Sequence, residues 1–173
     1  AVGKNALYAN TTASYNTAVG NASLVANTTG SQNTAVGHDA LNDNVDGHFN
    51  IAMGSNALAA NVSGDNNTAL GSGALGANTS TANTAVGRSA LNLNTTGTSN
   101  VAVGAEAAQT STTASYITAV GHEAAENNTA SYNTALGWQA LQGASGNITG
   151  GNNTGLGIVT LKNVTSGTAN TAS

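Results

Sequence analysis

The chain has 173 residues, of which only 6% are charged and 3% aromatic; the formal net charge is −4, and cysteine and proline are absent. An ordinary soluble domain has roughly 25% charged residues and many large core side chains, so this composition argues against a globular enzyme. Three basic residues against seven acidic ones argue against a nucleic-acid-binding protein, which presents a basic surface. We therefore expect no catalytic site, no cofactor and no resident metal ion.

Two kinds of membrane-related segment are also not indicated. No run of roughly 18 consecutive apolar residues predicts a transmembrane helix. No charged segment followed by an apolar run predicts a signal peptide. The absence of cysteine is compatible with an extracellular protein but does not require one.

The chain is a tandem repeat built on Ala-Val-Gly or a variant of it. The period is 17 residues, which is too short for repeats of paired helices, since these need about 33 residues or more. We predict an all-β parallel β-solenoid of about ten 17-residue coils, each with two short strands and two turns. Residues 1–173 form one repeat domain, and the opening Ala1-Val2-Gly3 is typical of a piece of a longer fibre. The repeats begin near residues 1, 18, 35, 52, 69, 85, 102, 119, 135 and 155.

Each coil contains a Thr-Ala-Val segment, as in residues 17–19 and 34–36. Alternation along a strand places Thr and Val on one face and Ala on the other. A leucine four residues after the glycine, such as Leu24, supplies a second aliphatic column. We predict that the Val and Leu columns fill the coil and that the Ala column faces a partner. Glycine itself is expected at a corner with positive φ.

Two asparagine columns run through the repeats. Stacked coils bring equivalent amides about 4.8 Å apart, where they hydrogen-bond along the stack. The fixed phase of these residues therefore predicts asparagine ladders. One column opens each Thr-Ala-Val segment and the other lies seven residues after the glycine: Asn16, Asn33, Asn50, Asn67, Asn83, Asn100, Asn133 and Asn153, and Asn10, Asn27, Asn44, Asn61, Asn78, Asn94 and Asn128.

Differences in coil length fall in one place, between the second asparagine and the next strand. The longest coil carries its extra residues around Ser145–Gly151. Insertions collect in surface loops, so this segment is expected to be exposed and the strands to be scaffold. Exchanging the loop within residues 137–157 for a standard one should leave folding intact and alter target binding.

The apolar core of such a coil is thin. Large side chains are few, and oligomerisation is the usual remedy for a small core. We therefore expect a parallel homotrimer in which three alanine columns meet along a threefold axis.

The recurring Asn-Thr-Ala-Val-Gly, as in residues 16–20 and 33–37, resembles the signature of trimeric autotransporter adhesin heads, which are YadA-like β-rolls. It also resembles the Asn-Thr-Ala-Val-Gly-x-x-Ala-Leu repeats of phage tail fibres and related trimeric adhesive fibres. The resemblance spans all ten repeats, but the period is 17 rather than roughly 14 residues and Thr replaces the first Val. It implies an elongated trimer on a bacterial cell surface or virion that presents a receptor-binding surface.

A few side chains are weak candidates for ligand contacts. His48 and Phe49 form the bulkiest loop tip, and Trp138 is the only tryptophan, for which we favour packing against a neighbour. His38 and His122 follow corner glycines, where three copies could form a metal-binding ring; an ordinary corner histidine is the preferred interpretation. Residues 42–47 resemble a calcium loop but have Met53 where a bidentate Glu is needed, which favours a plain polar loop. Four aromatic residues share a column, for which capping of the core is favoured over sugar stacking: Tyr15, Phe49, Tyr116 and Tyr132.

Three functions are open. The favoured one is an adhesive module, the head or shaft of a surface adhesin or phage tail fibre, that binds a cell-surface glycan or protein. The second is a purely structural spacer, which would tolerate loop substitutions. The third is an ice-binding solenoid; against it, the Thr column is single, is broken at Ile51 and Val101, and shares its face with the expected core valines.

Overall fold

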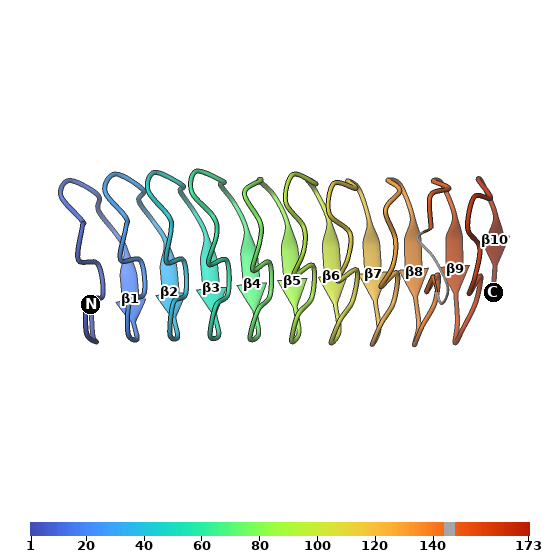
Figure 1. Ribbon diagram of the computed structural model, residues 1–173, viewed down its shortest axis with the longest axis horizontal. Helices are drawn as coiled ribbons and strands as arrows, with labels where there is room; N and C mark the ends of the chain where they lie inside the picture. Colours follow the sequence, from blue (N-terminus) through green and yellow to red (C-terminus); the bar gives the residue numbers. More distant parts are fainter. Residues whose placement is uncertain (144–147) are drawn as a thin grey trace.

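A computed structural model describes residues 1–143 and 148–173, which wind into a stack of similar coils (Figure 1). Each coil adds one short strand to a single parallel sheet, and the strand order follows the sequence from β1 to β10. The predicted all-β parallel solenoid with 17-residue repeats is confirmed. The strands are β1 (Thr17–Val19), β2 (Thr34–Val36), β3 (Ile51–Met53), β4 (Thr68–Leu70), β5 (Thr84–Val86), β6 (Val101–Val103), β7 (Thr118–Val120), β8 (Thr134–Leu136), β9 (Thr154–Leu156) and β10 (Thr171–Ala172).

The register of the sheet is set by the repeat itself. Thr17 pairs with Thr34 and Ala18 with Ala35, and equivalent residues remain paired along the sheet. Neighbouring strands in such a sheet lie about 4.8 Å apart. The glycine after each of the strands β1 to β9 forms the predicted corner, with φ of 137° at both Gly20 and Gly71.

The prediction of two strands per coil was wrong. After the corner glycine the chain adopts left-handed φ at alternate positions, for example 54° at Ala22 and 50° at Leu24. This segment still bonds to the next coil, since the Leu24 N–H donates to the Ala40 carbonyl at 3.0 Å. A left-handed leucine costs about 1–2 kcal/mol, but here it turns a fully buried side chain into the core. Sequence alternation did not reveal this conformation because leucine rarely adopts it.

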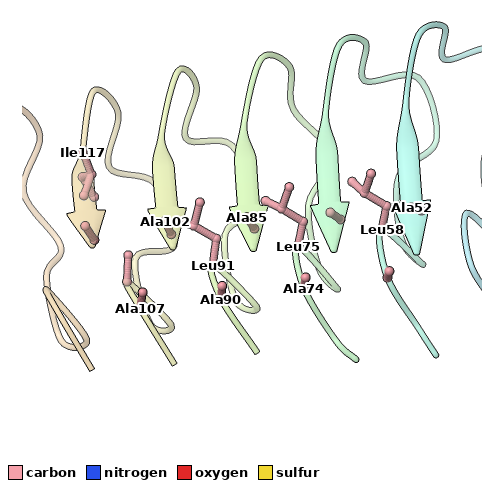
Figure 2. Close-up of a cluster of buried hydrophobic side chains, with 14 of the residues drawn as sticks. Ala52, Leu58, Ala74, Leu75, Ala85, Ala90, Leu91, Ala102, Ala107 and Ile117 are labelled. Atoms are coloured by element: carbon pink, nitrogen blue, oxygen red, sulfur yellow. The ribbon is translucent and has the colours of Figure 1, made fainter. Parts of the chain in front are cut away.

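The core consists mainly of the strand alanines, the leucines opposite them, and the alanine that precedes the leucine position in most coils. Figure 2 shows Leu58, Leu75 and Leu91 in a row inside the coils, with Ala85 among the buried strand residues. The prediction that the Leu column fills the coil is confirmed, but the prediction that Val also points inward and that Ala faces a partner was wrong, because Ala points inward and Val outward. In a typical coil the interior holds one leucine and two asparagine side chains. The space left at the centre of the strand therefore fits the methyl group of alanine but not a valine side chain.

Both asparagine ladders are confirmed. In the column seven residues after the glycine, the Asn44 amide donates to Asn27 Oδ1 at 2.8 Å, and the Asn61 amide donates to Asn44 Oδ1 at 2.9 Å. In the strand-opening column, Asn50 Oδ1 accepts the backbone N–H of Asn67 at 2.9 Å. These side chains are fully buried, so the ladders satisfy polar groups that water does not reach.

Two ladder oxygens, Asn61 Oδ1 and Asn94 Oδ1, are buried without a partner among the described residues. The next coil explains each case. In a shortened coil, the Asn78 amide donates to the Ser80 carbonyl. In the coil after Asn94, Ser111 replaces asparagine and donates to the Asn128 carbonyl at 2.6 Å. Each change in loop sequence or length thus interrupts the ladder locally.

Ile117 compensates for missing leucines. Ile117 stands where most coils have the strand-opening asparagine. It lies between Ala108 and Ala125, the two alanines that replace leucine in consecutive coils. All three side chains are buried in one cluster. We expect Ile117→Asn to lower the free energy of unfolding by about 3 kcal/mol, because it removes apolar volume.

The triple variant Ile117→Asn, Ala108→Leu, Ala125→Leu rebuilds the common coil and should recover to within about 1 kcal/mol of the wild type. Ala108→Leu alone should overpack the core and destabilise. Chemical denaturation of the single and triple variants measures this coupling. Additive losses would show that Ile117 does not fill the volume that the alanines leave.

Candidate functional site

The outward face of the sheet is the most regular surface of the molecule. Because alanine points inward, the first and third residue of each strand point outward and form two columns. The first column is threonine except at Ile51 and Val101, and the second is apolar throughout. Ile51 is 41% exposed and Met53 44% exposed. The residues of the second column are Val19, Val36, Met53, Leu70, Val86, Val103, Val120, Leu136 and Leu156.

This face carries no charge. None of the ten strands contains an acidic or basic residue, although the chain as a whole has ten. Nine steps between strands give a strip about 43 Å long, and three residues give a width of about 10 Å, or roughly 400 Å². The largest exposed apolar patch on a typical monomer is about 300–600 Å² and is often functional.

The aromatic column lies at one edge of this face, just before the strand-opening residues. The prediction that these side chains cap the core was wrong, because all four are largely exposed: Tyr15 84%, Phe49 56%, Tyr116 53% and Tyr132 57%. Each has left-handed φ, for example 59° at Tyr116, and an exposed side chain. Tyr116 and Tyr132 stack on each other with ring centroids 5.0 Å apart and planes 7° from parallel.

The three sequence-predicted ligand candidates have different surroundings. His48 is half-buried and holds neighbouring coils together. Its Nδ1 accepts the backbone N–H of Ser31 at 3.0 Å, and its backbone N–H donates to Asp65 Oδ1 at 2.7 Å. Phe49 is exposed beside it. Trp138 is also 48% exposed, at the opposite edge of the face, directly after a corner glycine. The rings of His48 and Phe49 lie together, with centroids 6.1 Å apart, but Trp138 lies several coils away from them.

A cluster that sequence reasoning missed lies at the same edge as Trp138. Glu106, His122 and Glu123 place one ligand atom each within 4.8 Å of one another. The sequence indicates this cluster in one way: Glu106 and Glu123 each lie two residues after a corner glycine, and His122 directly precedes Glu123. Both carboxylates already have partners, because Arg88 donates to Glu106 Oε1 and Gln139 donates to Glu123 Oε2 at 2.6 Å. The arrangement is a row of charge and amide contacts between successive coils.

The other proposed metal sites are not assembled within one chain. His38 lies several coils away from His122, beside Asp39 at 3.0 Å. In the calcium-like loop, Asn44 points into the core and uses its oxygen to accept from Asn61, so it does not serve as a ligand. Of the segment Ser145–Gly151, residues 145–147 lie outside the described residues. The expectation that this segment is exposed was wrong for part of the remainder, because Ile148 is fully buried in the core and pairs with Asn128 of the preceding coil.

Within residues 1–143 and 148–173 the structure contains no pocket. No helix in this part of the chain is long and apolar enough to cross a membrane. Comparison of the chain with protein-family models, curated proteins and solved structures finds no match in any of the three. The surface that the fold itself creates is therefore the remaining indication of function.

Proposed function

We propose that the protein is a module of a trimeric adhesive fibre, of the kind found on bacterial cell surfaces or virions, and that the outward face of the sheet is where three parallel copies meet. The observation that carries this proposal is the uncharged strip of threonine and aliphatic side chains along the whole sheet. Identical copies cannot complement one another's charges at equivalent positions, so a face without charge suits association around a symmetry axis. The face differs from the one expected from the sequence, because the alanines are inside the coil.

The assembled module then presents its loops and corners outward as an adhesive surface. The exposed aromatic column, with its stacked Tyr116 and Tyr132, offers apolar ring faces of the type that bind sugars or protein side chains. This supports recognition of a cell-surface glycan or protein over a purely structural spacer. A spacer would retain attachment of the fibre when Tyr116 and Tyr132 are replaced by serine.

We expect a solution mass near 50 kDa, about three times the 16.7 kDa of the chain, by light scattering on a sizing column. Val86→Glu places three charges together at the proposed axis and should yield a species near 16.7 kDa with unchanged circular dichroism. Glu is tolerated in the monomer because the position is not in the core. A matched substitution at a loop position, Val62→Glu, should keep the larger mass. If the wild type is monomeric, the trimer proposal is wrong.

Ice binding is a second candidate, and one observation favours it. Threonine was expected to share its face with core valines, which counted against ice binding, but both columns lie on the outward face instead. The threonine column is still single and is broken at Ile51 and Val101. A flat sheet with threonines repeated about every 4.8 Å is the regular surface that ice binding requires. A monomer that shows thermal hysteresis, abolished by Val86→Glu, would support this function and exclude the trimer on the same face.

A further inference from the structure

The repeat that builds the outward face also creates an ambiguity for copies that pack through it. A copy displaced by one coil, about 4.8 Å, would oppose nearly the same columns of side chains. Such a slip leaves nine of the ten strands opposed, so the repeat alone discriminates weakly between registers. Repetitive interfaces need specific features that make the wrong register unfavourable.

The chain has two such features on this face. Ile51 and Val101 are the only residues in the first column of the described strands that are not threonine. Ile51 also lies beside Met53, the longest side chain of the second column, in the same strand. Both positions are outward and substantially exposed, so neither substitution is required by the core of the single chain.

We propose that Ile51 and Val101 fix the axial register of the copies in the assembly, an inference that rests on the proposed trimer. Cyclic symmetry places equivalent residues at the same height, so Ile51 meets Ile51 and threonines meet threonines, whose hydroxyl groups can donate to one another. A one-coil slip opposes Ile51 to Thr34 or Thr68, and Val101 to Thr84 or Thr118. Each mismatch buries a threonine hydroxyl against an aliphatic group, where it has no partner.

Disulfide trapping tests the register directly, because the chain contains no cysteine. Val19→Cys and Val36→Cys occupy equivalent positions in adjacent strands, and Thr17→Cys and Thr34→Cys do so in the other column. Two cysteine variants of one column, carrying different tags, are refolded together and oxidised. Disulfides form most readily between Cα atoms about 5.5–6 Å apart. A one-coil slip brings positions 19 and 36 to the same height and therefore raises the yield of a link between them.

In the wild-type background we expect links between equivalent positions and few between adjacent ones. In the Ile51→Thr, Val101→Thr background, links between adjacent positions should increase about tenfold, since an unpaired buried hydroxyl changes a population by that order. The double variant should fold normally because threonine is the common residue at both positions. The control Val62→Thr, Leu93→Thr makes similar changes at exposed loop positions and should give the wild-type pattern.

Equal amounts of adjacent links in the wild-type and Ile51→Thr, Val101→Thr backgrounds would overturn the register proposal while leaving the trimer intact. A species of about 50 kDa that forms no disulfide from either column would also overturn it. A mass of 16.7 kDa for the wild type would instead show that the proposed assembly itself is wrong.

Discussion

Gly71→Ala is expected to lower the free energy of unfolding by about 4 kcal/mol or more, or to prevent folding. Gly71 has φ of 137°, a conformation that residues with a side chain rarely adopt. A Cβ atom there would lie 2.5 Å from the carbonyl oxygen of Gly87 and 2.6 Å from its carbonyl carbon. These are backbone atoms of the next coil, held by the parallel sheet, so they cannot move aside without opening the stack.

Gly73→Ala in the same coil is the matched control and should cost less than about 1 kcal/mol. Gly73 also has positive φ, 68°, but the nearest atom to an added Cβ is the Asn92 side-chain amide at 3.1 Å, which can shift. Equivalent coils have Ala22, Asp39 and Ser89 at this position with φ of 54–57°. Chemical denaturation followed by circular dichroism compares the two variants. Equal losses would contradict the assignment of Gly71 to an obligatory close approach of two coils.

Asn44→Ala is expected to lower the free energy of unfolding by about 3 kcal/mol, because it leaves buried polar groups without partners. The Asn44 amide donates to Asn27 Oδ1 at 2.8 Å and to the Gly47 carbonyl at 3.1 Å. Its own oxygen accepts from the Asn61 amide at 2.9 Å. Alanine removes all three bonds in the middle of the stack, where water does not replace them.

Asn21→Ala is the control, since Asn21 is exposed at a corner, and it should change stability by less than about 0.5 kcal/mol. Thermal and urea denaturation of both variants measure the difference. A loss below about 1 kcal/mol for Asn44→Ala would mean that the buried ladder contributes little and that packing alone holds the coils together.

The candidate face was only partly predictable. The sequence identified the threonine and aliphatic columns and placed them together, because strand alternation depends only on residue spacing. It did not determine that they point outward, so the predicted partner face was the alanine column. The exposed aromatic edge and the contacts of Glu106 with its neighbours also depended on the conformation of the corners. Left-handed residues there change the direction of the side chains, and composition does not show that change.

The sequence by itself determined the parallel solenoid, its coil length, the glycine corners and the asparagine ladders. Each of these follows from periodicity, since residues that recur at a fixed spacing must stack in register. Only the tertiary structure decided which side of the strand is the inside. The space across each coil is filled by Leu58 and its equivalents together with the buried asparagines, so it admits Ala52 but not Met53. The volume available across the coil decides which face of the strand points inward, and the spacing of residues in the sequence does not give that volume.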